Sequence, residues 1–432
     1  MTQKIAVLGA GTMGSGIAQL AAQSGFDVLM YDVKDEFVQR GMGNIKNALQ
    51  SRVDKGKMDA AEMDAILGRI NTTVERDDAA AADLIIEAAP EDVDLKREIF
   101  SSLSAQCSPG TILATNTSSL SITSIAAAAK RPERVVGLHF FNPAPVMPLV
   151  EIISATGTST DVVESVREIA QKMGKSPVRA ADMPGFIVNR VARPFYGEAL
   201  KILGEGTATV PAIDAAMRAA GFRMGPFELM DFIGIDINFA VTKSVYDAFF
   251  GEPRFRPSPI QQRMVEANTI GRKSGQGFYT YPDDKQGEPA YKPPVNMAHK
   301  RDVLFIPEHL IAGFLANGGI NMPGDDLAQG EIVTRILAMI MNEAAYAVGE
   351  GVASVRDIDT AMKLGTNYPK GPLKWADEIG LELVFNILKS LHASLGDERY
   401  RTAPLLRQMV RSGATGDAVG EGWHNPGEKG MV

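Results

Sequence analysis

Along the first part of the chain, short continuous apolar runs alternate with segments in which apolar residues recur at helical spacing. The apolar run at residues 5–8 is followed by glycines, then by Ile17, Leu20 and Ala21 at helical spacing, and then by a second apolar run at residues 28–31. This order predicts a strand, a glycine turn, a helix and a second strand. Further apolar runs separated by helical patterns lie at residues 84–86, 111–114, 135–138 and 149–153. The alternation predicts an α/β domain with a doubly wound sheet.

The strand pattern fades after Pro184, and helical patterns broken by glycine and proline follow, as at residues 195–203 and 211–220. We therefore expect a helical region after the sheet domain. Residues 281–302 carry several prolines among charged residues, which is the composition of a linker.

The helical region occurs twice in the sequence. Residues 187–190 match residues 332–335, and Glu198 matches Glu343, at an offset of 145 positions. The same offset relates further segments: 204–206 to 349–351, 213–214 to 358–359, and 275–278 to 420–423. Matches in one register predict a duplicated all-α domain. We expect a Rossmann-type dinucleotide-binding domain at residues 1–183, helical domains at 184–281 and 329–432, and a linker at 282–328.

Composition and charge exclude several classes of protein. The chain has 432 residues, 45% of them hydrophobic, which is enough for more than one core, and its net charge of −8 makes nucleic acid an unexpected partner. Cys107 is the single cysteine, so no intramolecular disulfide forms, which favours a reducing compartment. No apolar run reaches the roughly 18 residues of a membrane span, so the sequence predicts a soluble, cytoplasmic protein without a membrane partner. Histidines at metal-ligand spacing are absent, and no metal is expected.

Gly9, Gly11 and Gly14 lie between the first predicted strand and helix, and Asp32 ends the next predicted strand. Glycines in this position allow a tight turn and the close approach of a pyrophosphate, whose charge the helix N-terminus near Thr12 would meet. Asp32 would accept hydrogen bonds from ribose hydroxyls and repel a 2′-phosphate, which favours NAD over NADP. A surface turn with an ordinary aspartate is the alternative.

His139 ends a predicted strand, at the sheet edge where open α/β folds place their ligands. Glu151 lies in the apolar run at residues 149–153, where a carboxylate requires a partner. Two interpretations fit these residues equally well. In one, the carboxylate holds the imidazole for catalysis; in the other, His139 is a structural histidine.

Three further polar residues lie close to the ends of predicted elements. Ser118 and Ser119 follow a strand, and one of them is expected to cap a helix while the other faces the crevice. Asn189 lies in the first turns of an apolar helix, where its amide needs a partner. Its counterpart in the second helical copy is Thr334.

Together these motifs resemble the L-3-hydroxyacyl-CoA dehydrogenase family over about residues 4–281. The resemblance implies reversible, NAD-dependent oxidation of a (3S)-3-hydroxyacyl-CoA to a 3-oxoacyl-CoA in fatty acid or related metabolism. It places the catalytic histidine on His139, the orienting glutamate on Glu151, and substrate contacts on Ser118 and Asn189. It places cofactor contacts on Gly9, Gly11, Thr12, Met13, Gly14, Asp32, Glu91, Lys96, Ser118, Asn142 and Lys273.

The family's coenzyme A-binding helical hairpin is similar to residues 45–57, with Lys55 as a contact and Ala48 in place of a serine. The duplicated helical domain resembles the tandem arrangement of the multifunctional β-oxidation enzymes. Thr334 in place of an asparagine then predicts a second copy that is catalytically silent and packs on the first, which gives a monomer with an internal pseudo-dimer. A homodimer is the alternative.

Two other functions fit part of the pattern. A dehydrogenase of small β-hydroxyacids, with a lysine as acid and base, has a related plan but leaves His139 and Glu151 unexplained. A protein that binds NAD without turnover is the other alternative, and the retained Ser118 and Asn189 argue against it.

Overall fold

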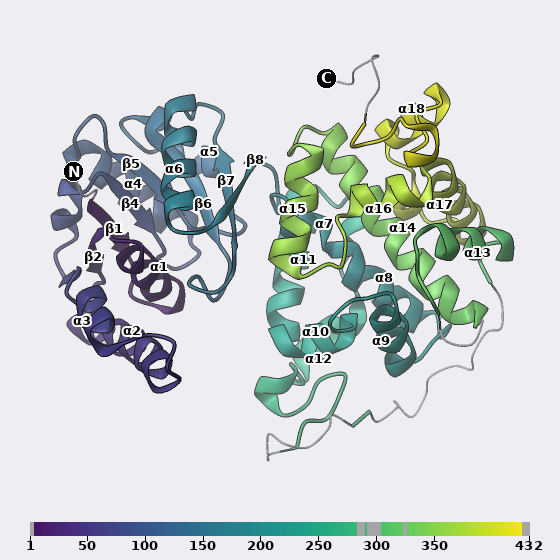
Figure 1. Ribbon diagram of the computed structural model, residues 1–432, viewed down its shortest axis with the longest axis horizontal. Helices are drawn as coiled ribbons and strands as arrows, with labels where there is room; N and C mark the ends of the chain where they lie inside the picture. Colours follow the sequence, from purple (N-terminus) through teal and green to yellow (C-terminus); the bar gives the residue numbers. More distant parts are fainter. Residues whose placement is uncertain (1–3, 283–289, 292–303, 323–325, 426–432) are drawn as a thin grey trace. The chain divides into compact units, whose positions relative to one another are not determined.

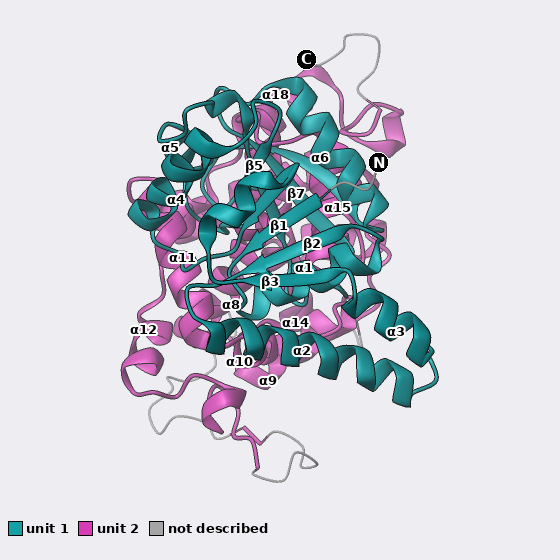
Figure 2. Ribbon diagram, turned by 90° about the vertical axis from the view of Figure 1, so that its left-hand side faces the viewer, with its two compact units in different colours: residues 1–186 teal, residues 187–432 magenta. Residues whose placement is uncertain are grey.

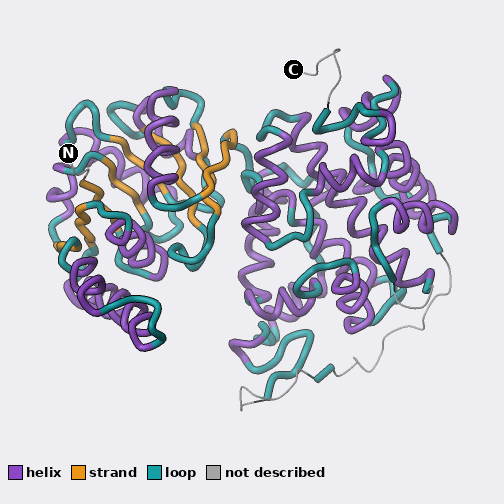
Figure 3. Tube along the Cα trace, viewed as in Figure 1, coloured by secondary structure: helices purple, strands orange, loops and turns teal. Residues whose placement is uncertain are grey.

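The computed structural model describes residues 4–282, 290–291, 304–322 and 326–425. The chain divides into two compact units, Met1–Phe186 (unit 1) and Ile187–Val432 (unit 2), coloured separately in Figure 2. Strands and helices alternate in unit 1, whereas the regular elements of unit 2 are helical (Figure 3). The predicted fold class, an α/β domain followed by helical repeats, is confirmed.

Unit 1 is built on a sheet whose described strands run in the order β3-β2-β1-β4-β5-β6-β7-β8 (Figure 1). The strands from β3 to β6 in this order are parallel to their neighbours, β7 is antiparallel to β6, and β8 is parallel to β7. The strands are β1 (Lys4–Leu8), β2 (Asp27–Tyr31), β3 (Ile70–Thr73), β4 (Leu84–Glu87), β5 (Ile112–Thr115), β6 (Val135–Phe140), β7 (Leu149–Ser154) and β8 (Ser176–Ala181).

The two edge strands, β3 and β8, were not predicted from the sequence. β3 carries Asn71, Thr72 and Thr73, and β8 contains Pro177 and the exposed Arg179. An edge strand pairs on one side only, so it does not need the continuous apolar run that marks a central strand of a parallel sheet. The predicted strands are the ones that are buried on both faces.

The helices of unit 1 connect successive strands and bury their apolar faces against them. They are α1 (Thr12–Gln23), α2 (Asp35–Asp54), α3 (Ala60–Leu67), α4 (Val93–Gln106), α5 (Ile122–Ala126) and α6 (Thr160–Lys172). α1 packs with α2 and α3, while α4 packs with α5. The core of the unit is a continuous cluster that includes Ile5, Ile17, Met30 and Ile86.

The helices of unit 2 follow one another twice in the same order. The first set is α7 (Val188–Val191), α8 (Arg193–Gly204), α9 (Val210–Ala219), α10 (Pro226–Ile233), α11 (Ile235–Ala248) and α12 (Pro259–Glu266). The second set is α14 (Leu327–Gly349), α15 (Val355–Thr366), α16 (Pro372–Ile379), α17 (Leu381–Leu395) and α18 (Pro404–Ser412). An additional helix, α13 (Glu308–Asn317), precedes the second set, within the segment expected to be a linker.

One long helix, α14, corresponds to two short ones, α7 and α8. The break falls at Ala192, two residues before Pro194. In the second copy, Met339 stands at the position equivalent to Pro194. Proline lacks a backbone N–H and its ring clashes with the carbonyl four residues earlier, which accounts for the break. Among the described residues, α14 is the one helix long and apolar enough to cross a membrane, but 89% of its most apolar window is buried in the structure. It packs against α8, α9 and α16 and so forms the core of unit 2.

Two buried arginines join the two helical copies reciprocally. Arg190 Nε of the first copy donates to Glu343 Oε1 of the second at 2.7 Å, and Arg335 Nε of the second donates to Glu198 Oε1 of the first at 2.6 Å. Arg190 and Arg335 are 0% and 1% exposed. These residues are related by the offset seen in the sequence, so the duplication produced two equivalent ion pairs.

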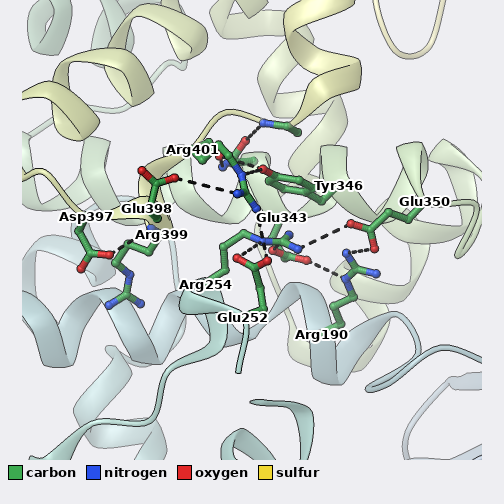
Figure 4. A network of polar contacts seen from close by, with 12 residues as sticks. Arg190, Glu252, Arg254, Glu343, Tyr346, Glu350, Asp397, Glu398, Arg399 and Arg401 are labelled. Carbon is green, nitrogen blue, oxygen red and sulfur yellow. Dashed lines mark hydrogen bonds and ion pairs between the residues drawn. The ribbon is translucent and has the colours of Figure 1, made fainter. Parts of the chain in front are cut away.

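Additional groups complete each ion pair. Arg254 Nη1 donates to the other oxygen of Glu343 at 2.7 Å (Figure 4). Tyr400 Oη donates to Glu198 at 2.7 Å. Burial alone would raise the pKa of Glu198, but the charge of Arg335 lowers it below its ordinary value. A buried carboxylate that is held ionised in this way depends on its cation.

We expect Arg335→Ala to lower the free energy of unfolding of unit 2 by about 3–5 kcal/mol, because the variant leaves the buried Glu198 without its closest cation. The chain's two tryptophans, Trp375 and Trp423, both belong to unit 2, so their fluorescence during denaturant unfolding follows this unit. Lys374→Ala, which removes an exposed ion pair with Asp417, is the control, with an expected loss of about 1 kcal/mol or less. Equal losses in the two variants would contradict the assignment.

Candidate active site

The turn between β1 and α1 requires glycine at two positions. Gly9 has a φ of +107°, and a Cβ on Gly14 would lie 1.8 Å from the carbonyl oxygen of Gly9. A side chain at either position is therefore excluded. By contrast, a Cβ on Gly11, the N-cap residue of α1, meets no atom within 4 Å. The N-terminus of α1, with Thr12 and Met13 in its first turn, therefore faces open space and carries the partial positive charge of the helix.

Asp32 joins the end of β2 to this turn. Its Oδ2 accepts a hydrogen bond from the backbone N–H of Ala10 at 2.7 Å, and its Oδ1 accepts one from that of Val33 at 2.7 Å. The carboxylate is half-buried beside the glycine turn. An open helix N-terminus and a neighbouring carboxylate are the donor and acceptor groups that a dinucleotide requires, so these residues fit NAD.

Glu91 organises the segment that follows β5. It accepts hydrogen bonds from the hydroxyls of Thr117, at 2.5 Å, and Ser119, at 3.0 Å, and from the backbone N–H of Ser118, at 3.1 Å. Burial alone would raise the pKa of Glu91, but these hydrogen bonds and the charge of Lys96 lower it below its ordinary value. Glu91 therefore stays ionised and fixes the backbone at Ser118.

Lys96 lies behind this segment. It is 1% exposed, and its Nζ donates to Glu87 Oε1 at 2.6 Å and to the carbonyl of Ala89 at 3.2 Å. The other oxygen of Glu87 accepts from the hydroxyl of Thr115 at 2.6 Å. These contacts tie together the carboxyl ends of β4 and β5. The predicted contact of Lys96 with the cofactor stays a prediction.

His139 and Glu151 face each other across neighbouring antiparallel strands. They are directly opposed in the register of β6 and β7, and His139 Nδ1 lies 2.7 Å from Glu151 Oε2. Glu151 is fully buried and His139 is 6% exposed, with the ring of Phe141 at 4.6 Å and that of Phe186 at 6.0 Å between centroids. Strand register therefore gives the imidazole a carboxylate partner in an apolar setting.

Three residues that sequence reasoning missed hold the segments around His139. Asn116 Oδ1 accepts from the backbone N–H of Phe140 at 2.8 Å, which fixes the end of β6.

The buried Lys175 donates to the carbonyls of Ala144 at 2.6 Å and Met147 at 2.8 Å, and burial lowers its pKa. Asp182 accepts from the backbone N–H groups of Ile122 and Thr123 at the start of α5. These contacts depend on tertiary structure and leave no local pattern in the sequence.

The expected helix cap was placed wrongly. The N-cap of α5 is Ser121, whose hydroxyl accepts from the backbone N–H of Ser124 at 3.1 Å, and neither Ser118 nor Ser119 caps the helix. The helix begins later because residues 117–119 are held by Glu91 instead. Ser118 is therefore not needed as a cap.

The other predicted contacts lie in separate regions of the chain. Asn142 is exposed two residues after the end of β6, and Lys55 is the exposed C-cap residue of α2. Asn189 and Lys273 belong to unit 2, where Lys273 pairs with Asp236 at 2.6 Å, so their participation in the same site as His139 stays a prediction. The described part of the chain contains no cluster of residues able to hold a metal ion.

Family models match the whole arrangement. Residues 4–183 match the NAD-binding domain of 3-hydroxyacyl-CoA dehydrogenase, and residues 185–281 and 330–425 each match the C-terminal domain of the same family. The second helical copy is thus recognised as the same kind of domain as the first.

Named relatives cover the chain almost completely. It is 43% identical to 3-hydroxyadipyl-CoA dehydrogenase of Escherichia coli (strain K12), across 94% of this chain and 97% of that protein. It is 34% identical to the fatty acid oxidation complex subunit alpha of Pseudomonas syringae pv. tomato, across 95% of this chain and 55% of that protein. The crystal structure of 3-hydroxybutyryl-CoA dehydrogenase from Escherichia coli K12 superposes with a TM-score of 0.84 at 40% identity, covering 96% of this chain and 99% of that one.

We expect Lys96→Met to destabilise unit 1 by about 3–5 kcal/mol, because Glu87 is left buried without its cation. Hydrogen exchange of peptides from β4 and β5 measures the loss as reduced protection. The double variant Lys96→Met/Glu87→Gln, which removes both charges, should recover a large part of the protection. If the double variant is no better protected than the single one, the ion pair is not what holds these strand ends.

Proposed function

This chain belongs to the 3-hydroxyacyl-CoA dehydrogenase family, and we propose that His139 and Glu151 form the general-base pair with which it oxidises a (3S)-3-hydroxyacyl-CoA to a 3-oxoacyl-CoA. The observation that supports the pair is the buried 2.7 Å contact of His139 Nδ1 with Glu151 at the carboxyl end of β6. Family membership makes the protein an NAD-dependent oxidoreductase. When bound, NAD⁺ accepts the hydride that leaves C3 of the substrate.

We infer a role for each ring nitrogen of His139 from its contact with Glu151. A proton on Nδ1 is donated to Glu151, which leaves Nε2 as the acceptor for the proton of the substrate hydroxyl. The imidazolium that results is stabilised by the carboxylate of Glu151. The residues around the ring exclude water and so strengthen this interaction. The reaction releases one proton to the histidine for each hydride transferred, and the reverse reaction returns it.

Further residues orient the reactants. Ser118, whose backbone Glu91 holds, and Asn189 are proposed to hold the substrate oxygens in line with His139. Gly9, Gly11, Thr12, Met13, Gly14 and Asp32 are proposed to hold the dinucleotide, and Lys55 to contact coenzyme A. Thr334 replaces the asparagine in the second copy and is fully buried, which supports a second copy without catalytic function. The reciprocal ion pairs between the copies support a monomer with an internal pseudo-dimer.

The alternatives have less support. A small β-hydroxyacid dehydrogenase requires a lysine as acid and base, and it gives no role to the buried His139–Glu151 pair. An inactive NAD-binding protein gives none to that pair either. The relatives include enzymes named for 3-hydroxybutyryl-CoA and for 3-hydroxyadipyl-CoA, so a short and a dicarboxylic acyl group are the two substrates to compare.

The reaction is tested by nicotinamide absorbance after mixing the chain with acetoacetyl-CoA or 3-oxoadipyl-CoA, in parallel with NADH and NADPH. We expect oxidation of NADH and a strong preference over NADPH. Asp32→Asn should reduce that preference roughly tenfold to hundredfold, since hydrogen bonds to a charged group contribute about 1.5–3 kcal/mol. Asp35→Asn, three residues away and exposed in the first turn of α2, is the matched control. No oxidation of either cofactor with either substrate would reject the proposed reaction.

The general base is tested by His139→Gln, which should lower kcat about 10²- to 10⁴-fold, the usual contribution of such a group. Glu151→Gln should also lower kcat and change the pH profile, because an amide cannot stabilise the imidazolium. His392, which lies 3.3 Å from Glu398 on the surface of unit 2, supplies a matched control in His392→Gln. Near-normal turnover of the His139 variant, or an unchanged pH profile in the Glu151 variant, would remove the pair from the mechanism.

A further inference from the structure

Unit 2 contains a pocket of about 380 Å³ between its two helical copies. Its walls come from α8 and from residues 253–260 of the first copy and from residues 397–399 of the second. The side chains of Leu200, Pro257 and Ile260 make part of the wall apolar. Its charged residues are the cations Lys201, Arg256 and Arg399 and the carboxylates Glu205 and Asp397. The volume is in the range of sites for small molecules.

The equivalent space on the other copy is filled by the chain itself. Asn342 Nδ2 donates to the carbonyl of Arg401 at 3.0 Å, and Asn342 Oδ1 accepts from the backbone N–H of Ala403 at 2.8 Å. The ring of Tyr346 lies over the guanidinium of Arg254, 3.6 Å from its centroid to Cζ, and its hydroxyl accepts from Arg401 at 3.2 Å (Figure 4). An amide edge and an aromatic ring therefore occupy this position in the second copy.

The first copy lacks both groups. At the offset of 145 positions, Gly197 stands where the second copy has Asn342, and Lys201 stands where it has Tyr346. The two backbone groups that Asn342 bonds correspond to the carbonyl of Arg256 and the N–H of Ser258. Neither of these makes a hydrogen bond within the described part of the chain. A donor and an acceptor without a partner in that part of the chain thus belong to two residues that line the pocket.

Arg399, the counterpart of Arg254, is also left without its aromatic partner. It is 8% exposed, and its Nε is buried without a hydrogen-bond partner among the described residues, with Glu198 as the nearest carboxylate at 3.6 Å. Its Nη2 lies 3.2 Å from the position of a Cβ on Gly197. Lys201 cannot replace Tyr346, because its Nζ pairs with Asp397 at 2.9 Å. A buried guanidinium face therefore lines the pocket.

We propose that this pocket binds an adenine nucleotide. The adenine N6 amino group can donate to the carbonyl of Arg256 while N1 accepts from the N–H of Ser258, as the amide of Asn342 does in the second copy. The flat ring can stack on the guanidinium of Arg399, as Tyr346 does on Arg254. The side chain of Arg256 is exposed, so its guanidinium can pair with a phosphate. Guanine presents O6 as acceptor and N1–H as donor, so it meets the same two groups only when the base is turned over, which moves its ribose to the other side of the base.

Calorimetric titration of the full chain with AMP, GMP and inorganic phosphate, each in the presence of saturating NADH, tests this assignment. NADH keeps the nucleotide from the glycine turn of unit 1. We expect AMP to bind to one site per chain. GMP and phosphate should bind with an affinity at least about tenfold lower than that of AMP. A parallel titration in which coenzyme A competes with AMP shows whether the adenine comes from a free nucleotide or from the adenosine end of CoA; both sources use the same contacts.

The second copy provides the variants. Gly197→Asn puts the chain's own amide on Arg256 and Ser258, and Lys201→Tyr puts a ring on Arg399, so each should weaken AMP binding about tenfold or more. The new Cβ at position 197 meets only the end of a flexible side chain, and tryptophan fluorescence of unit 2 checks that the fold is retained. Gly313→Asn, at a helical glycine of unit 2 outside the pocket, is the matched control.

Several results would overturn the proposal: no AMP binding up to millimolar concentration, equal binding of AMP and GMP, or AMP binding that Gly197→Asn leaves unchanged. Binding heat from AMP that persists in the Gly197→Asn variant comes from a site other than this pocket, such as the glycine turn of unit 1. The variant therefore distinguishes a failure of NADH to occupy that turn from a failure of AMP to bind in the pocket.

Discussion

The reciprocal Arg–Glu pairs between the two helical copies are the interaction on which the architecture of unit 2 depends. Each copy supplies one buried arginine and one buried glutamate, Arg190 with Glu198 and Arg335 with Glu343, and each charge is neutralised by the other copy. A charge in a nonpolar interior is tolerated only with its partner in place, so neither copy can fold with its charges satisfied unless the other packs against it. The register between α8 and α14 is thereby fixed.

Unit 1 uses the same principle to build its candidate site. Glu87 and Lys96 neutralise each other behind β4 and β5, and Glu151 meets His139 across β6 and β7. In each case a buried carboxylate has one geometry in which it is satisfied, and that geometry fixes a strand end at the carboxyl edge of the sheet. Antiparallel pairing of β7 on β6 is what brings Glu151 opposite His139 in an otherwise parallel sheet.

How much of this could be predicted follows from what each feature depends on. The central strands and the glycine turn have local patterns, and both were recognised in the sequence. The edge strands β3 and β8 have none, because one-sided pairing does not require an apolar run. His139 and Glu151 were each identified, but twelve residues of separation do not determine strand register, so a structural histidine could not be set aside. Lys175 and Asp182 act through backbone groups of distant segments, which a single sequence does not encode locally.

Duplication explains why the two copies differ where they do. The arginines and glutamates at their shared core cannot change singly, since each variant would leave a partner buried and charged. Positions beside that core carry no such constraint. There the second copy has Thr334 in place of Asn189 and fills its outer space with Asn342 and Tyr346, while the first copy has Gly197 and Lys201 and leaves that space open. The two helical copies are therefore free to differ at positions around the ion pairs but not at the ion pairs themselves. A new binding site is expected at those surrounding positions.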